Sequence, residues 1–383
     1  MMNALERRST FALSSIFALR MLGLFMIIPV FSVAGQEYAG ATPALIGLAV
    51  GVYGLTQAIL QIPFSLIADR YSRKPLVVIG LLLFALGGAI AAMSDSIYGV
   101  IIGRAIAGGG AVSAVVMALL ADVTREENRM KAMATMGMSI GVSFAVAFSL
   151  GPWLTGLVGI SGLFWVTTIM GLAAISMLLL VPKVTRHHRN FQQGYVAQLK
   201  QVLKMGDLNR LHVSVFALHL LLTAMFIYVP SQLIDFAQIP LSSHGLVYLP
   251  LLILSLLFAF PSIVLAEKYR KMRGIFLTAI GGIILGLGIL IFGFESKYIL
   301  LLGLGLFFIA FNVMEALLPS WLSKAAPIQS KATAMGVNAS SQFLGAFFGG
   351  MIGGQLLVLN NTAMGWGILG DRFRRSRPAS ISS

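Results

Sequence analysis

Long apolar runs separated by short polar segments dominate the pattern of this 383-residue chain. A helix needs about 20 apolar residues to cross a bilayer, and eleven runs approach or exceed that length. These runs are residues 11–33, 43–68, 75–93, 97–121, 131–158, 160–182, 211–234, 244–266, 274–294, 297–321 and 331–359. The pattern predicts an all-α membrane protein with eleven clear spans.

The two ends of this pattern need separate comment. A twelfth run begins at Gly365–Gly370 and is stopped by segment 371–378 with its four arginines, so we expect the twelfth span to be incomplete. The first run could instead be a signal peptide that ends near Ala34. It is too long for the apolar core of a signal peptide and carries Arg20 in its middle, which favours a membrane span.

Charged residues lie mainly in the loops, and their sign alternates along the chain. One set of loops is cationic, as at Arg73 and Lys74, whereas the other set is acidic, as at Glu37. Cytoplasmic loops carry the excess of lysine and arginine. The alternation predicts a multi-pass protein of the bacterial cytoplasmic (inner) membrane with its N-terminus in the cytoplasm.

The longest polar segment, 183–210, lies mid-chain and is rich in cations. It predicts a cytoplasmic basic linker. Around 195–205 the linker is either an amphipathic helix on anionic lipid or part of a flexible tether. It would divide the chain into an N-terminal six-helix half, 1–182, and a C-terminal half, 211–383, of five helices, a truncated sixth and a basic tail.

Short matches between the two halves recur at an offset of 198 or 199 residues. Phe17–Arg20 recurs as Phe216–His219, and Ala68–Tyr71 recurs as Ala266–Tyr269. Two halves repeated in the same orientation are typical of one large class of membrane carriers, in which the substrate site lies between the halves. The repeat therefore predicts two parallel-repeat helical halves around a central cavity.

Composition excludes several functions. Charged residues make up only 10% of the chain, against roughly 25% in soluble domains. The net charge of +14 could suggest nucleic acid, but the cations lie between apolar runs and not on one compact face. There is no cysteine, the five histidines lack metal-ligand spacing, and no Gly-x-x-x-x-Gly-Lys-Ser/Thr motif occurs. We expect no metal, cofactor or nucleic acid, and a monomer in the lipid bilayer.

The loop between the second and third runs carries a family resemblance. It reads Asp69-Arg70-Tyr71-Ser72-Arg73-Lys74, preceded by Ser65. It resembles the Gly-x-x-x-Asp-Arg-x-Gly-Arg-Lys signature of the major facilitator superfamily, with serine at both glycine positions. The resemblance is closest to the YajR-type subgroup of drug/proton antiporters. It implies a transporter, not an enzyme, that works by alternating access on a small-molecule substrate.

A second charged loop, 122–129, completes the cytoplasmic picture. By the resemblance we expect a charge network that closes the cytoplasmic side when the opposite side is open. The predicted gating residues are Asp69, Arg70, Arg73, Lys74, Asp122 and Arg129.

Charged residues deep within spans are costly unless they pair or face water, and most are functional. Arg20 lies in a segment that resembles the first-helix motif of drug/proton antiporters. Arg104 resembles the arginine of the fourth-helix motif Arg-x-x-Gln-Gly, with Ala107 at the glutamine position. The predicted proton and substrate cavity comprises Arg20, Arg104, His219, Asn312 and Glu315. The alternative is a structural ion pair between helices.

Among the acids, only Glu315 lies deep within a span. Burial and a nearby cation shift a carboxyl group's affinity for protons in opposite directions, so such a group can load and release a proton. We predict that Glu315 carries the proton, with His219 as the next candidate. The opposing interpretation is that Glu315 is a permanent ion-pair partner or binds substrate.

Small residues recur every four positions in the fifth run, from Gly137 to Ser149, and again in the eleventh, from Ser341 to Gly353. Such spacing lets helices approach closely. The residues Gly141, Gly151, Pro152 and Gly156 resemble the fifth-helix motif of antiporters, which implies a pivot that blocks leak. Plain tight packing would need the same residues.

Three functions fit these observations. The leading one is a proton-coupled efflux antiporter of small hydrophobic or drug-like compounds. The second is a carrier of the same fold for a specific metabolite or sugar. The third is a non-transporting membrane scaffold or a channel, but a scaffold needs neither a repeated two-half design nor buried charges.

Overall fold

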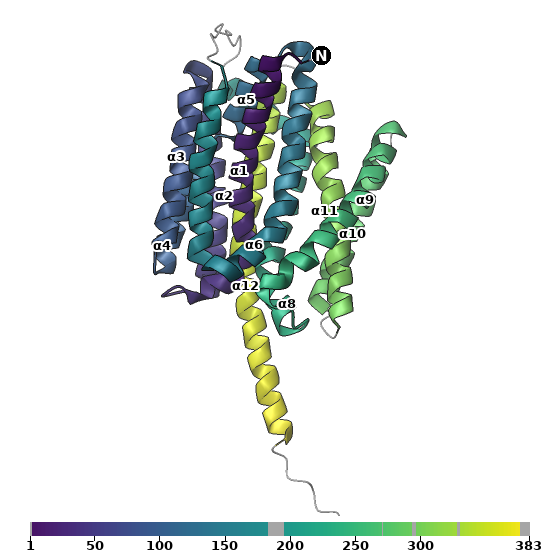
Figure 1. Cartoon of the computed structure of the whole chain (residues 1–383). Helices are drawn as coiled ribbons and strands as arrows, with labels where there is room; N and C mark the ends of the chain where they lie inside the picture. The colour runs from purple at the N-terminus through teal and green to yellow at the C-terminus, as the bar shows by residue number, and fades with distance from the viewer. Residues whose placement is uncertain (1, 183–194, 270, 293–295, 328–329, 376–383) are drawn as a thin grey trace, which may run out of the picture.

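The computed structural model describes residues 2–182, 195–269, 271–292, 296–327 and 330–375, and that part of the chain is almost entirely helical (Figure 1). The α-helices are α1 (Ala4–Ala34), α2 (Pro43–Arg70), α3 (Arg73–Ala92), α4 (Ile97–Gly108), α5 (Ser113–Val123), α6 (Glu126–Met177), α7 (Tyr195–Lys204), α8 (Gly206–Asp235), α9 (His244–Lys268), α10 (Met272–Phe292), α11 (Lys297–Ala325) and α12 (Lys331–Arg375).

The predicted membrane spans are confirmed as helices. Ten helical segments of the described chain are long and apolar enough to cross a membrane. One of them, α6, turns back at Gly159, whose φ of 68° lies in the left-handed region that favours glycine. It therefore comprises two of the predicted runs, 131–158 and 160–182.

The fourth predicted span, 97–121, is present as Ile97–Val123 and comprises two helices. It is interrupted between α4 and α5, where the Ala111 N–H donates to the Gly109 carbonyl and the Val112 N–H donates to the Gly110 carbonyl. Three successive glycines, 108–110, weaken the helix here. A Cβ atom at Gly110 would also clash with the backbone of Gly80 on α3. Close packing against α3 explains the break, and hydrophobicity alone does not reveal it.

Helices α1–α6 and α8–α12 form two groups in the same order along the chain. Three pairs of helices join the groups: α2 with α12, α1 with α8, and α6 with α9. We define the α2–α12 seam as Gly47, Gly51, Gly350 and Gly354 with their backbone partners. A Cβ atom at Gly51 would lie 2.6 Å from the Phe347 carbonyl oxygen, and one at Gly350 would lie 2.5 Å from the Gly47 carbonyl oxygen. The seam therefore brings the two backbones into direct contact.

The small-residue stripe of α6 is packed at one end and open at the other. Near the end of its first leg, the Ser149 carbonyl touches Gly245 at the start of α9 so closely that no side chain fits between them. At Gly137 and Gly141, nearer the start of α6, a Cβ atom would meet nothing within 4 Å. The two groups are therefore joined at one end and separated at the other.

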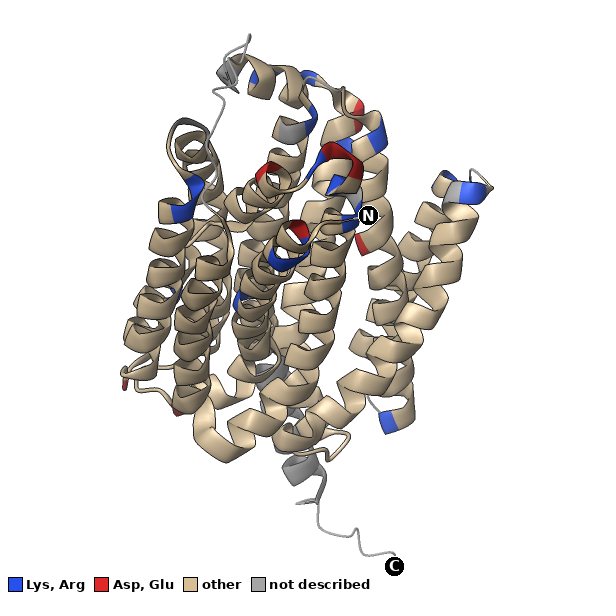
Figure 2. Ribbon diagram, turned by 45° about the horizontal axis from the view of Figure 1, so that its top comes forward, with Lys and Arg blue, Asp and Glu red and all other residues tan. Residues whose placement is uncertain are grey.

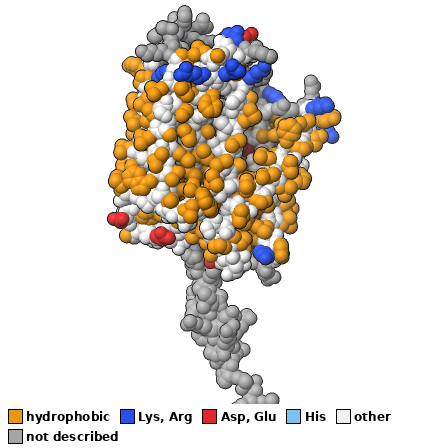
Figure 3. Space-filling model, viewed as in Figure 1, with side chains coloured by type: hydrophobic (Ala, Val, Ile, Leu, Met, Phe, Trp, Pro, Cys, Tyr) orange, Lys and Arg blue, Asp and Glu red, His pale blue; other side chains and the backbone are white. Residues whose placement is uncertain are grey.

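The charges show which side of the membrane the open end faces. Lysine and arginine gather at the end of the molecule that carries the N-terminus (Figure 2). A hydrophobic belt lies below them, with acidic side chains beyond it (Figure 3). Because cations mark the cytoplasmic side, the open end faces the cytoplasm and the joined end faces the opposite side.

The linker and the C-terminal segment add two details. The predicted helix around 195–205 is present as α7, and its Gln198 side chain accepts a hydrogen bond of 3.0 Å from Thr333 at the start of α12. Its contact with lipid stays a prediction, and residues 183–194 lie outside the described chain. Residues 365–370 continue α12, which runs on to Arg375, whereas the candidate span within this helix ends at Leu359.

Candidate functional site

Arg20 is the centre of a buried polar cluster in the N-terminal group. Its side chain is 2% exposed and reaches from α1 to α2 and α5. Nη1 donates to Ser113 Oγ at 2.6 Å, and Nη2 donates to Tyr53 Oη at 2.9 Å and to Gln57 Oε1 at 2.5 Å. Gln57 in turn donates to Gln61 Oε1 at 3.3 Å. Neutral oxygens thus accept hydrogen bonds from both terminal nitrogens of this buried guanidinium. Burying the charge in this way costs less free energy than burying it without partners.

Arg104 bridges α4 and α2 in a different way. Its Nε donates to the Ala49 carbonyl at 2.7 Å and its Nη2 donates to the Val50 carbonyl at 3.1 Å. The guanidinium also lies 5.4 Å from the centre of the Tyr53 ring, a distance at which a cation and a ring attract each other. Arg20 and Arg104 therefore share Tyr53 as a neighbour, and both are buried within the N-terminal group.

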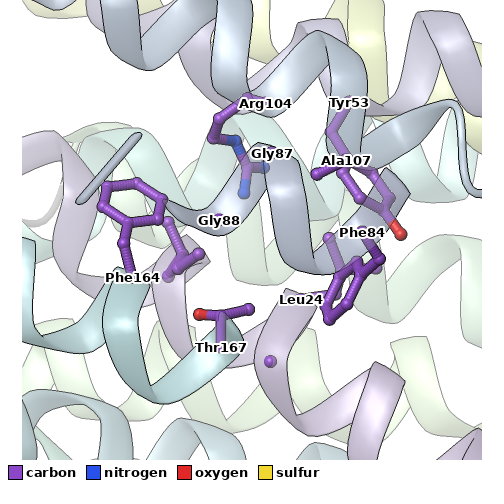
Figure 4. Close-up of a pocket in the computed structure, with 11 residues that line it drawn as sticks. Leu24, Tyr53, Phe84, Gly87, Gly88, Arg104, Ala107, Phe164 and Thr167 are labelled. Carbon is purple, nitrogen blue, oxygen red and sulfur yellow. The ribbon is translucent and has the colours of Figure 1, made fainter. Parts of the chain in front are cut away.

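A small cavity lies beside Arg104 (Figure 4). Tyr53, Phe84, Phe164 and Thr167 are among the side chains that line it, and its volume is about 10 Å³. That volume suits about one water molecule, whereas sites for drug-sized ligands are in the range of about 300–1,000 Å³. This cavity is not the substrate site.

The second polar cluster lies in the C-terminal group. Glu315 on α11 and His219 on α8 face each other, with Glu315 Oε2 3.6 Å from His219 Nε2. Gln342 on α12 places its Nε2 2.7 Å from the same ring nitrogen. The Glu315 side chain is 40% exposed, although it lies deep within a span, so open space adjoins it. Glu315 is thus more exposed than its partner His219, whose side chain is 9% exposed.

Asn312 lies one turn before Glu315 on α11. Its Nδ2 donates to Ser255 Oγ at 2.8 Å and to the Phe308 carbonyl at 3.0 Å. The bond to Ser255 joins α11 to α9. Asn312 therefore lies near Glu315 on the same helix, and its hydrogen bond to Ser255 holds two helices together.

Aromatic rings connect the two groups next to the Glu315 cluster. Phe144 on α6 stacks with Phe311 on α11 at 6.5 Å between ring centres. Phe148 lies 4.3 Å from Phe226 on α8, and Phe311 also contacts the His219 ring at 5.9 Å. The polar cluster thus borders an apolar, aromatic surface.

The cytoplasmic charged loops are partly brought together. Arg73 Nη1 lies 2.6 Å from Asp122 Oδ2, in an ion pair between α3 and α5. Lys74 Nζ donates to the Val181 carbonyl at the end of the sixth span. The side chains of Asp69 and Arg70 lie outside the described part. Arg129 is partly buried, and its place in a network stays a prediction.

Glu6 joins this region although no motif contains it. Its buried carboxylate accepts hydrogen bonds from the Arg125 backbone at 2.8 Å, from the Arg125 side chain, and from Asn128 Nδ2 at 3.0 Å. These charge-assisted bonds raise the pKa of Arg125. Glu6 also completes a capping box with Asn3 at the start of α1. The cytoplasmic ends of α1 and α6 are thereby tied together.

The predicted antiporter motif is distributed over two contacts. A Cβ atom at Gly151 would lie 2.6 Å from the Met26 carbonyl, so α6 touches the α1 backbone there. Gly156 approaches Ser242 of the C-terminal group, at 3.0 Å between the corresponding Cβ positions. Pro152 lies within α6 between them. Gly141 is free of contacts at its Cβ position, because it lies at the open end.

Comparisons with known proteins decide the family. The model of the Major Facilitator Superfamily matches residues 13–350. The chain belongs to this superfamily. The inner membrane transport protein YajR of Escherichia coli K12 is 46% identical over 91% of this chain and 77% of its own length. The multidrug resistance protein MdtH of Proteus mirabilis is 26% identical over 87% of this chain and 82% of its own length.

Solved structures agree with the superfamily fold. A bacterial homologue of the human lysosomal transporter Spinster, in an inward-facing and unoccupied conformation, matches with a TM-score of 0.77 at 15% identity. The match covers 98% of this chain and 86% of that chain. The expectation of a major facilitator transporter and not an enzyme is thus confirmed. Among the described residues, no group of histidine, cysteine or acidic side chains could hold a metal ion.

Sequence reasoning missed three residues of the polar clusters described above: Gln57, Gln342 and Glu6. Each is an uncharged or terminal residue whose role depends on a partner more than thirty positions away. Gln57 lies four residues after Tyr53 and four before Gln61, a spacing that places polar groups along one helix face. That spacing is the signal that could have found it. Nothing local distinguishes Gln342.

Proposed function

We propose that this major facilitator is a proton-coupled antiporter that exports small hydrophobic, drug-like compounds across the bacterial inner membrane. The halves 1–182 and 211–383, joined by the cytoplasmic linker 183–210, would alternate between access from the cytoplasm and access from outside. The similarity to YajR, an inner membrane transport protein, and the more distant similarity to MdtH support this proposal.

The Glu315–His219 pair is the observation that carries the proposal. A carboxyl group and an imidazole at 3.6 Å can share one proton between two titratable sites. The Glu315 side chain is 40% exposed, and the two groups are separated at the cytoplasmic end, a path by which protons and a substrate would reach it. Phe144 and Phe311 beside the pair favour an apolar or aromatic substrate.

The two arginines have a supporting role in this proposal. Arg20 and Arg104 fix α1, α4 and α5 to α2 through neutral acceptors, so the N-terminal half can move as one body. Arg73 and Asp122 tie α3 to α5 at the cytoplasmic edge of the same half. The proposed moving part is therefore the space between the halves, where Glu315 lies.

Transport in proteoliposomes tests the proposal. Purified protein is reconstituted with an entrapped pH-sensitive dye, and ethidium, chloramphenicol or D-xylose is added on one side. Proton movement with ethidium or chloramphenicol but not with D-xylose supports drug efflux. Proton movement with the sugar alone supports the metabolite carrier, and proton movement with none of the three contradicts the proposal.

Glu315→Gln separates proton coupling from substrate binding. We expect this variant to lose transport driven by a pH gradient while it keeps substrate binding and exchange without a gradient. Glu37→Gln, an exposed acid outside the spans, is the matched control and should transport as the wild type does. If pH-driven transport survives in Glu315→Gln, the coupling proton travels elsewhere, and His219→Gln is the next variant.

A further inference from the structure

Two hydrogen bonds define the tautomer of His219. Its Nδ1 lies 3.0 Å from the Val215 carbonyl oxygen, which only accepts, so Nδ1 carries a hydrogen. Its Nε2 lies 2.7 Å from the amide nitrogen of Gln342, which only donates, so Nε2 carries none. The two contacts agree on one neutral form of the ring.

Glu315 competes for the same ring nitrogen. Its Oε2 is buried, has no hydrogen-bond partner among the described residues, and lies 3.6 Å from Nε2, beyond hydrogen-bond distance. A carboxylate at this position would attract a protonated ring, whereas the Gln342 amide in its present orientation donates to Nε2 and favours the neutral nitrogen. The nitrogen therefore has one neighbour that favours protonation and one that opposes it.

Gln342 belongs to α12, one of the helices that join the two halves. Two residues earlier, Ser340 Oγ donates to the Ala58 carbonyl of α2 at 3.5 Å, and later along α12 Gly350 lies in the α2–α12 seam. Phe343, the next residue, touches Gly54 of α2 through its carbonyl oxygen. The amide that contacts His219 is thus carried by the helix whose position depends on the arrangement of the halves.

We propose that Gln342 is a positioning residue that keeps His219 neutral in the cytoplasm-open state and leaves the proton to Glu315. When the proton moves from the Glu315 carboxyl to His219 Nε2, the Gln342 amide turns over, and the new N–H donates to Gln342 Oε1. This inference rests on the proposed function, because it assigns the proton of the same pair to one member in this conformation.

The other groups around His219 leave this assignment to Gln342 and Glu315. On α8 the ring meets the Val215 carbonyl, on α11 it meets Phe311 and Glu315, and on α12 it meets Gln342. Of these contacts, Glu315 is the one charged group. The buried cation of α1, Arg20, is directed to α2 and α5.

Nitrogen-15 NMR of histidine-labelled, full-length protein tests the inference without a transport assay. The His219→Gln variant identifies the His219 signals by their loss. In the wild type we expect the neutral His219 ring to carry its hydrogen on Nδ1. In Gln342→Glu, a carboxylate replaces the donor, and the midpoint of the His219 titration should rise by about one pH unit or more, a tenfold change in the ratio of protonated to neutral ring.

The matched control is Gln355→Glu, the same change on an exposed position of α12. It should leave the midpoint within a few tenths of the wild-type value. Gln342→Met, which keeps the length of the side chain but cannot donate, should also raise the midpoint and serves where Gln342→Glu does not fold. An unchanged midpoint in both Gln342 variants, or hydrogen on Nε2 in the neutral wild type, would overturn the proposal.

The outcome is separable from that of the proposed function. If Glu315→Gln keeps pH-driven transport while the Gln342 variants shift the His219 midpoint, the antiport mechanism fails and the positioning role stands. If Glu315→Gln loses coupling and the Gln342 variants leave the midpoint unchanged, the antiport mechanism stands and the role of Gln342 is wrong.

Discussion

Glu6, on the first turn of α1, accepts a hydrogen bond of 2.8 Å from the backbone N–H of Arg125, the residue that precedes α6. Helix α6 has no side-chain cap of its own at Arg125. A carboxylate near a helix N-terminus satisfies a backbone donor and interacts favourably with the helix dipole. One helix therefore supplies the missing cap of another, at the cytoplasmic end of the molecule.

This relationship predicts that Glu6→Gln lowers the melting temperature of the purified protein. Glutamine keeps the shape but loses the charge that strengthens the bonds to Arg125 and Asn128. Glu126→Gln, an exposed acid in the first turn of α6, is the control and should melt near the wild-type temperature. Equal melting temperatures for Glu6→Gln and the wild type would show that the cap contributes nothing measurable.

The Arg73–Asp122 pair predicts a rate effect. Asp122→Asn should insert normally but transport more slowly, because α3 and α5 lose their ion pair of 2.6 Å at the gate. The exchanged pair Arg73→Asp with Asp122→Arg should recover part of the rate, since the attraction is restored. Initial rates in proteoliposomes measure both effects. A doubly exchanged protein no faster than Asp122→Asn would show that the charges act separately.

The contacts of Arg104 predict that lysine at this position gives a less stable protein than arginine. Lysine keeps the charge but lacks the planar fork that contacts the Ala49 and Val50 carbonyls and the Tyr53 ring. We expect Arg104→Lys to lose roughly 1–3 kcal/mol of stability, the usual effect of leaving a buried acceptor unsatisfied. Denaturant unfolding of the purified protein measures it. The exposed Arg210→Lys is the control and should be neutral.

The open end of the α6 stripe predicts a contact that forms when the cytoplasmic side closes. Ser149 meets Gly245, and α6 and α9 run in opposite directions. Eight residues back along α6 and forward along α9, Gly141 should then meet Ile253, which is 53% exposed in this state. The chain has no cysteine, so Gly141→Cys with Ile253→Cys gives a clean cross-linking pair.

Cross-linking of this pair should increase under conditions that favour access from outside and trap the protein without transport. The control pair Val142→Cys with Ile253→Cys places one cysteine on a neighbouring face of α6, where Val142 is 64% exposed, and should cross-link less. Equal yields for the two pairs in every condition would contradict the expected closure.

The lengths of the apolar runs predicted most of the fold, because a membrane requires long apolar helices whose backbone hydrogen bonds are satisfied internally. The break between α4 and α5 depends instead on the approach of Gly110 to Gly80 on another helix, which no local pattern contains. The fifth and sixth spans were separated correctly at Gly159, since glycine there permits the left-handed turn.

The candidate site was predicted less completely than the fold. Burial of charge drew attention to Arg20, Arg104 and Glu315, and of these three the structure leaves only Glu315 partly exposed. From the sequence, both arginines were placed in one predicted cavity with Glu315. Their hydrogen bonds go instead to neutral oxygens of α2 and α5. Uncharged acceptors carry no signal in a hydropathy pattern, so their partnership with a buried cation was not visible.

The α2–α12 seam has a mechanical consequence. Helices that interlock through large side chains are held near a few preferred crossing angles, because ridges of one fit grooves of the other. At Gly47, Gly51 and Gly350 the two helices present bare backbone to each other, so there are no interlocking ridges to lift out of register. The seam can therefore keep the two halves in contact while the tilt of one half relative to the other changes.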